Sequence, residues 1–195
     1  GLGTGVYALI KVGRESIKTF SDLIEIQNVT NKSFADMAYK IEELAKVSVP
    51  DFGMSELTLK QIASRYQAMG VAMGFTQGRM SDMSIELTKL AADMASFYNV
   101  EQKAVAESLE SVFTGTTRPL RTYGLDLTQA TLQEWALKQG LDANIASMSQ
   151  AEKTMLRYQY VMAHTKEIAG DFKDTELTWA NQTRILAQSF QQLAT

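Results

Sequence analysis

The stretch from Met80 to Phe97, MSDMSIELTKLAADMASF, decides the fold class. Its apolar residues recur every three or four positions, as one face of an α-helix requires. The same spacing returns along the rest of the chain, and no segment shows the sustained alternation of a half-buried strand. The pattern therefore predicts an all-α protein, a multi-helix bundle of about six to seven amphipathic helices with no sheet. We place the helices at residues 6–47, 55–73, 79–98, 101–113, 128–139, 149–168 and 174–194.

The chain divides into an N-terminal helical arm, residues 1–30, and a helical core domain, residues 31–195. We expect the first helix to break near residues 28–33 and residues 115–124 to form a loop or turn. The sequence begins with Gly1 rather than Met. This fits a fragment of a longer protein or a processed one, and the arm is expected to continue from upstream chain. Because isolated helices of this length are marginal in water, they are expected to pack into a compact bundle.

Residue pairs at two kinds of spacing support the helical reading. Ser33, Asn99 and Ser149 each precede an acidic or amide residue by three positions, which is the spacing of a capping box. Glu42 with Lys46, and Glu56 with Lys60, are oppositely charged pairs one helical turn apart. Such pairs contribute about 0.2–0.5 kcal/mol each to a helix.

Composition excludes several function classes. The chain has no cysteine, so disulfides and thiolate metal sites are excluded. Its formal net charge is −3, which gives no electrostatic reason to bind nucleic acid without specificity. The apolar stretch from Val6 to Val12 is short and contains Lys11, so it cannot cross a bilayer. Membrane contact is therefore expected only from regions outside this segment, and no specific nucleic acid is expected as a partner.

Candidate reactive residues are few. His164 is the only histidine, so it has no Cys or second His with which to hold a metal, and we expect a structural role at a helix C-terminus. Asp82, Glu86, Lys89 and Asp93 share one helix face, which we interpret as solvated. We predict no catalytic, metal-binding or cofactor-binding residue, and no enzyme activity.

Three glycines, Gly70, Gly74 and Gly78, recur every four residues. They are expected to end one helix and form the loop to the next. Close helix packing and a hinge are the alternatives, since a glycine inside a helix costs about 1 kcal/mol relative to alanine. We name the three as a possible hinge and expect this stretch to be the weakest joint of the bundle.

Methionine is abundant, and Met69, Met73, Met80, Met83 and Met94 follow helical spacing. Methionine is flexible and polarizable, so it fills irregular gaps where helices cross. Filling of the core is the favoured interpretation. The alternative is an adaptable groove for a partner helix, which would make the protein a generic helical adaptor.

Sequence blocks in a fixed order carry a family resemblance. The first is ADMASFYNV at residues 92–100, and the second joins Phe113-Thr114-Gly115 to Pro119-Leu120 and Tyr123-Gly124. The third joins MSQAEK at residues 148–153 to LRYQYV at 156–161, and the last joins Gly170-Asp171-Phe172 to TWANQTR at 178–184. In this order they resemble the core region of the bacteriophage tail tape measure family, over about residues 20–195; Thr178 stands where serine is expected. The motif positions are Phe97, Tyr98, Asn99, Gly115, Pro119, Arg157, Tyr158, Tyr160, Trp179, Asn181 and Gln182.

The resemblance implies a structural phage tail protein. Such a protein scaffolds assembly of the tail tube, helps to set tail length and is released during DNA ejection. The implied partners are the tail tube protein, tail assembly chaperones, tail tip or baseplate proteins and further copies of the chain itself. The implied location is the virion tail, in the tube lumen or at the tip, and the host cytoplasm during assembly.

A tape measure should be extended, whereas the spacing of helix ends here predicts a compact bundle. We therefore expect residues 31–195 to form a tape-measure core domain that folds separately, while long helical stretches beyond Thr195 measure length. A second possibility is that the bundle is an assembly form that opens when it is threaded into the tube.

Overall fold

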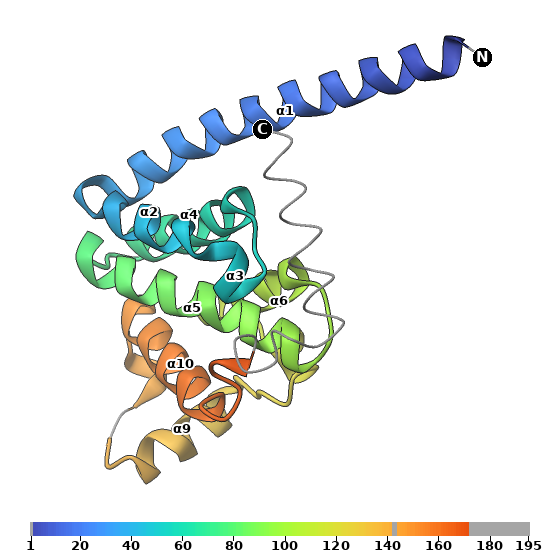
Figure 1. Ribbon diagram of the computed structural model, residues 1–195. Coiled ribbons are helices and arrows are strands. Elements are labelled where there is room, and N and C mark those ends of the chain that lie inside the picture. Colours follow the sequence, from blue (N-terminus) through green and yellow to red (C-terminus); the bar gives the residue numbers. More distant parts are fainter. Residues whose placement is uncertain (1, 142–143, 172–195) are drawn as a thin grey trace.

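The computed structural model describes residues 2–141 and 144–171, with side chains from residue 18 onward. Every regular element within these ranges is helical and none is a strand, which confirms the predicted all-α bundle (Figure 1). The elements are α1 (Leu2–Phe34), η1 (Ala35–Met37), α2 (Ala38–Lys46), α3 (Ser48–Phe52), α4 (Glu56–Ala72), α5 (Gln77–Phe97), α6 (Gln102–Leu109), α7 (Ser111–Thr114), α8 (Arg118–Arg121), α9 (Gln129–Lys138), η2 (Ile145–Ser147) and α10 (Gln150–His164).

The predicted helices at 55–73, 79–98, 128–139 and 149–168 correspond to α4, α5, α9 and α10. Two other boundaries were wrong. The first helix continues through residues 28–33 and ends at Phe34, and the expected loop at 115–124 contains the short helix α8. The predicted helix at 174–194 lies outside the described residues.

The reversal after α1 depends on packing rather than on local preference. Ala35 has a φ of 47°, a left-handed conformation that residues with a Cβ seldom adopt. Phe34 and Ile41, on either side of it, are completely buried. Their burial fixes the path of the chain between α1 and α2, and this position carries no glycine that would have marked the turn in the sequence.

Side-chain caps begin several helices, but only one predicted capping box is confirmed. At the start of α10 the Ser149 hydroxyl accepts from the Glu152 backbone N–H (3.2 Å), and the Glu152 carboxylate accepts from the Ser149 N–H (2.7 Å). Ser33 instead lies inside α1, and Asn99 lies in the turn before α6 with a φ of 52°. The three-residue spacing was therefore correct at one site of three.

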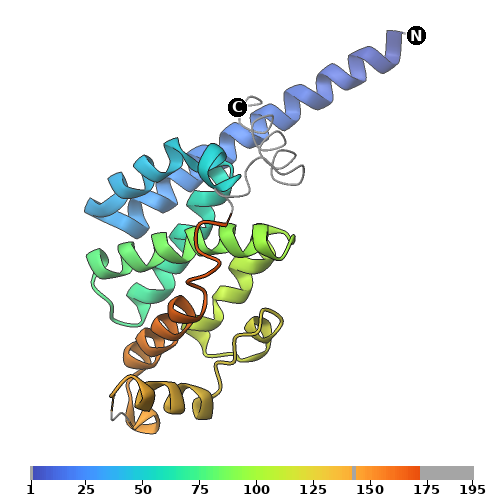
Figure 2. The same cartoon turned by 60° about the horizontal axis from the view of Figure 1, so that its bottom comes forward.

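The helices follow one another across the molecule from α1 at one end to α9 at the other (Figures 1 and 2). α4 and α5 pack against each other at the centre, with α1 on α4 and α6 on α5. α10 packs on α7 and α9. The N-terminal half of α1 extends beyond the other described helices, so only the second half of this helix contacts the body (Figures 1 and 2).

A single apolar core runs through α4, α5 and α6. Met80, Met83 and Met94 belong to it and are almost completely buried, which confirms that they fill the core. Tyr66 is also buried, and its hydroxyl donates to the Ala106 carbonyl oxygen (2.7 Å). This bond matters because a buried hydroxyl left without a partner costs about 1–3 kcal/mol.

The three spaced glycines occupy three different environments. Gly74 forms the turn after α4 with a φ of +95°, as expected for a residue that ends a helix. Gly70 lies inside α4, where an added Cβ would come within 1.9 Å of the Met80 sulfur. Gly78 lies in the first turn of α5 with open space around it. Gly74 therefore forms the loop, and Gly70 allows close packing against Met80. A hinge at these glycines stays a prediction.

Candidate functional site

Two motif positions from different blocks meet where α10 crosses α7. The Arg157 guanidinium donates from Nη1 to the carbonyl oxygens of Val112 (3.2 Å) and Phe113 (3.4 Å), near the C-terminal end of α7. An added Cβ at Gly115 would lie 2.6 Å from Nη2 of Arg157, and Gly115 has a φ of +74°. Both the conformation and the close approach therefore favour glycine. Burial lowers the pKa of Arg157.

Aromatic motif residues gather at the end of α5. The ring centroids of Phe97 and Tyr98 are 5.0 Å apart, and those of Tyr98 and Tyr123 are 5.1 Å apart. The Tyr98 hydroxyl donates to the Tyr123 carbonyl oxygen (3.1 Å). Phe97 is 54% exposed, so one face of this cluster is open to solvent. Asn99 follows directly and makes the left-handed turn that leads to α6.

Tyr158 and Tyr160 point from α10 toward different neighbours. The Tyr158 hydroxyl donates to the Glu86 carboxylate on α5. Burial, and then this carboxylate, raise the pKa of Tyr158. Tyr160 is buried, and its ring meets that of Trp135 on α9 edge to face at 5.7 Å. Both tyrosines therefore attach α10 to other helices, as core positions do.

The remaining motif positions add no reactive group. Pro119 lies in the first turn of α8, where proline is tolerated because no intrahelical N–H is needed. Trp179, Asn181 and Gln182 lie outside the described residues. The resemblance alone grouped the motif positions in the sequence. The structure brings Gly115 and Arg157 together, and it places Tyr98 against both Phe97 and the block residue Tyr123.

The acidic face of α5 is only partly solvated, so that interpretation was wrong for Asp93. Asp93 is 7% exposed, and its Oδ2 accepts from the Gly170 backbone N–H (2.8 Å). This contact holds the segment after α10 against α5. Nothing in the helical spacing distinguished Asp93 from its exposed neighbour Asp82, because the segment that covers it is distant in sequence.

His164 lies at a helix C-terminus, as predicted, and is the last residue of α10. Its Nδ1 lies 2.8 Å from the Tyr160 carbonyl oxygen, and its ring lies 4.0 Å from that of Tyr160 between centroids. In the part of the chain that the structure describes, no three His, Cys, Asp or Glu side chains come close enough together to hold a metal ion.

The buried ammonium of Lys60 was not anticipated. It donates to Glu56 on its own helix (2.6 Å), to Glu42 on α2 (3.0 Å) and to the Gln27 side chain on α1. The predicted pair of Glu56 and Lys60 is therefore confirmed, whereas Lys46 bonds Glu43 rather than Glu42. This Lys60 junction ties three helices together through charge.

Glu42 shows the electrostatic effect of the Lys60 junction. Partial burial alone would raise the pKa of Glu42, but hydrogen bonds from Gln27 and Lys60 outweigh it. The pKa of Glu42 is consequently lowered from its ordinary value.

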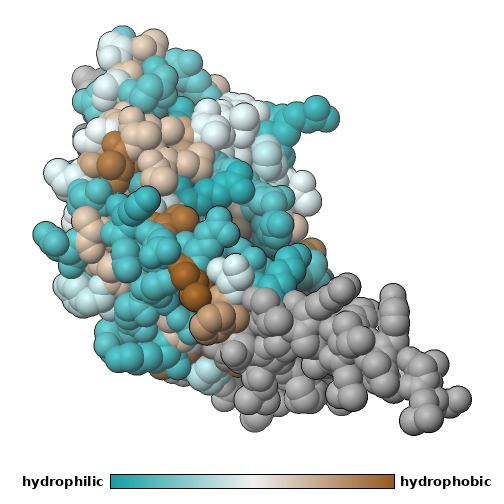
Figure 3. All heavy atoms as spheres, turned by 90° about the horizontal axis from the view of Figure 1, so that it is seen from above, coloured by the Kyte–Doolittle hydropathy of each residue, from teal (hydrophilic) through white to brown (hydrophobic). Residues whose placement is uncertain are grey.

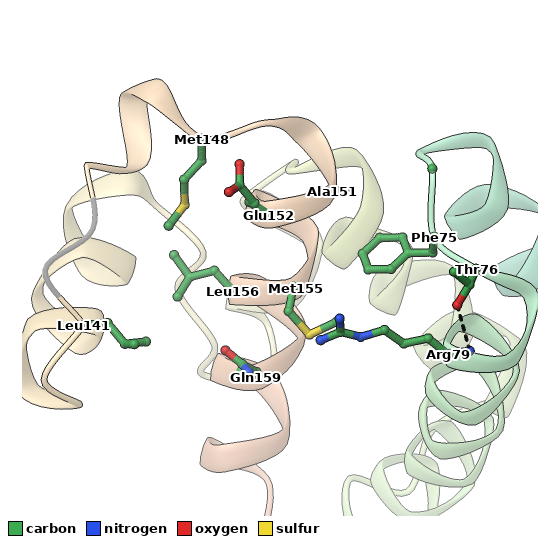
Figure 4. Close-up of a pocket in the computed structure, with 11 residues that line it drawn as sticks. Phe75, Thr76, Arg79, Leu141, Met148, Ala151, Glu152, Met155, Leu156 and Gln159 are labelled. Carbon is green, nitrogen blue, oxygen red and sulfur yellow. Dashed lines mark hydrogen bonds between the residues drawn. The ribbon is translucent and has the colours of Figure 1, made fainter.

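An apolar groove of about 540 Å³ opens between the α4–α5 turn and α10 (Figure 4). Phe75 lies on the side of the turn, and Met148 and Met155 lie on the side of α10, with Arg79 reaching toward Met155 (Figure 4). Methionine side chains do line a groove in this protein, but they are not those predicted, since Met80, Met83 and Met94 are buried.

No helix within residues 2–141 and 144–171 combines the length and the apolar character needed to cross a membrane.

Comparison with protein-family models, curated proteins and solved structures gave no match to any of them. The resemblance to tail tape measure proteins therefore rests on the sequence blocks alone and stays a prediction.

Proposed function

We propose that the chain is a structural assembly domain of a bacteriophage tail tape measure protein, which associates with itself through α1. The ordered sequence blocks support the family. The contact of Gly115 with Arg157 and that of Tyr98 with Tyr123 support a packing role for its motif positions, because residues from separate blocks stabilise one another. Self-association is inferred from α1, whose N-terminal half projects beyond the other described helices (Figure 1).

α1 has 33 residues, so it is about 50 Å long at about 1.5 Å per residue. Its inner face packs on the body through Ile26, Thr30 and Phe34, which are buried. Its outer face leaves Phe20 (55%) and Ile24 (51%) exposed one turn apart. The face of the molecule seen from above in Figure 3 is mainly hydrophilic, with a few hydrophobic spots. Exposed large apolar side chains in series are typical of an interface.

The exposed pair belongs to a seven-residue repeat that runs along the projecting half. Positions three and four residues apart, as in a coiled coil, hold Gly3, Val6, Ile10, Gly13, Ile17, Phe20 and Ile24. Isoleucine recurs at seven-residue intervals at Ile10, Ile17 and Ile24, and β-branched residues at that position suit parallel pairs of helices. Arg14 is the one charged residue at the flanking positions of this repeat, so like charges do not oppose pairing with a second copy. A second copy of α1 is therefore the occupant that the pattern fits.

Sedimentation equilibrium of the full chain tests self-association. We expect the wild-type chain to associate, and Phe20→Glu to weaken the association about tenfold or more, because a charge would enter an apolar seam. Val29→Glu is the matched control, since Val29 is an exposed residue of α1 that lies off the repeat. A wild-type chain that stays monomeric, or equal weakening by both variants, would contradict the interface.

The tail assignment needs a separate test in the phage or prophage that encodes the chain. Peptides of the protein should be found by mass spectrometry in purified tails, and loss of the gene should abolish tails of defined length. Normal tails without the protein would contradict the assignment, whether or not the chain associates with itself.

A helical adaptor is the second candidate, and the groove of Figure 4 is the observation that favours it. Met155→Glu would place a charge in that groove without touching α1. If the protein is an adaptor, Met155→Glu should abolish binding of a partner helix and Phe20→Glu should leave that binding unchanged. If its function depends on α1, Phe20→Glu should impair it and Met155→Glu should not.

A further inference from the structure

A second, polar groove of about 290 Å³ lies beside the contact of Arg157 with Gly115. Its walls come from the end of α7, the segment after it, α9 and α10. The polar side chains that line it are those of Thr114, Thr117, Gln129, Gln150, Lys153 and Arg157. No aspartate or glutamate is among the described residues that line this groove, so its charge is positive in a chain whose net charge is −3.

The two cations of the groove lie one turn apart on α10, where like charges repel. Within the described residues neither Lys153 nor Arg157 forms an ion pair, although Arg65 pairs with Glu110 (2.8 Å) and Arg121 with Asp126 (3.3 Å). A guanidinium removed from water is ordinarily compensated by a carboxylate or phosphate. Here no carboxylate among the described residues pairs with it, and its hydrogen bonds to described residues go to backbone carbonyl oxygens.

Hydrogen-bond donors in the groove are uncommitted. Arginine has five N–H donors, and both bonds that Arg157 makes to described residues use Nη1. Gly115 has no Cβ, so the guanidinium packs closely against its backbone, and neither Nε nor Nη2 makes a hydrogen bond to described residues. The side chains of Thr117 and Gln150, which line the same groove, make no hydrogen bond to described residues either. Donors and positive charge therefore converge on one concave surface.

We propose that this groove is an oxyanion site that binds a carboxylate or phosphate group. Arg157 forms two parallel bonds to two oxygens of the anion through its planar guanidinium. Lys153 supplies the second charge, and the Thr117 hydroxyl and the Gln150 amide donate to the remaining oxygens. Gly115 keeps the guanidinium close to the wall. The site is independent of the α1 seam, so its failure would leave the tail assignment and self-association untouched.

Titration of the full chain with sodium phosphate and, separately, with sodium acetate tests the site. Sodium chloride at the same ionic strength is the reference, and chemical shifts of the Gly115 and Thr117 amides are the readout. We expect saturable shifts with phosphate or acetate that chloride does not produce. Equal responses to both anions would identify a carboxylate as a sufficient ligand, and a response to phosphate alone would identify a phosphate-bearing ligand. Shifts no larger than those in chloride would overturn the proposal.

Two variants locate the binding. Lys153→Gln removes a charge without disturbing the bonds from Arg157 to α7, and Arg157→Gln removes the principal donor. Each should weaken anion binding about tenfold or more, because hydrogen bonds to charged groups are among the strong ones. Lys89→Gln, at an exposed lysine of α5, is the control and should bind as the wild type does. Undiminished binding by Lys153→Gln would overturn the assignment even if Arg157→Gln failed to fold.

Discussion

Lys60 and Arg157 both bring a positive charge into the helical bundle, but they do so in different surroundings. The ammonium of Lys60 is met by Glu42, Glu56 and the Gln27 side chain from three helices. Among the described residues, Arg157 donates to backbone carbonyl oxygens alone and lies against Gly115. A buried charge with carboxylate partners fixes the arrangement of the helices that supply them. A charge without such partners keeps donors for a group from outside the chain.

Removal of both carboxylates from the Lys60 junction should have the largest effect. The double change Glu42→Gln and Glu56→Gln leaves the buried ammonium without a countercharge. We expect a loss of about 3 kcal/mol in the free energy of unfolding, measured by urea denaturation. Lys60→Met is the control, because it removes the charge and keeps much of the side-chain volume, and it should cost less than the double change. The opposite order would mean that the junction acts through packing rather than charge.

Gly115→Ala should have the next largest effect. A φ of +74° strains alanine by about 1 kcal/mol or more, and the new methyl group would displace the Arg157 guanidinium. Thermal and urea unfolding should both show the loss. Gly78→Ala is the matched control: it lies in α5 with open space around it, so the change should stabilise the protein by up to about 1 kcal/mol. Equal responses at the two glycines would contradict the close approach of Arg157.

Arg157→Met should cost less than the double change at the Lys60 junction. Its two bonds to carbonyl oxygens are near the long end of the hydrogen-bond range, and no carboxylate among the described residues depends on them. We expect a loss of about 1 kcal/mol in the free energy of unfolding, by urea denaturation. A loss as large as that of Glu42→Gln with Glu56→Gln would show that Arg157 is mainly structural.

The pH dependence of stability gives the smallest effect. The pKa of Glu42 is lowered in the folded state, so its carboxylate stabilises the protein above the ordinary pKa of glutamate, and this contribution is lost as the pH falls through the folded pKa. The difference in stability between the wild type and Glu42→Gln should therefore shrink between about pH 5 and pH 3. A constant difference over this range would mean that the ionised carboxylate adds nothing.

Predictions from sequence succeeded where the information is local. The spacing of apolar residues predicted α4, α5 and α10, because an amphipathic helix needs one apolar side whatever it packs against. The capping box at Ser149 was found for the same reason, since its bonds span three residues. The burial of Asp93 escaped notice because Gly170, which covers it, lies far along the chain.

The Lys60 junction and the groove around Arg157 could not be predicted from the sequence either, although Lys60 and Arg157 each belonged to a predicted pair or motif. Lys60 was predicted to pair with Glu56 on its own helix, but its contacts to Gln27 and Glu42 require the fold of α1 and α2. Arg157 and Gly115 were both motif positions, yet nothing in either block indicated that they touch. Long-range polar contacts depend on how helices cross, and helical spacing does not encode the crossing.

By itself the sequence determined that this protein is helical, where α4, α5 and α10 lie, and that Met80, Met83 and Met94 fill the core, because each follows from the period of the α-helix. Tertiary structure alone decided which charges are compensated, where the chain turns after Phe34, and which face of α1 is left exposed. Those features depend on distances between residues that are remote in sequence, and such distances are set only when the apolar faces have packed together.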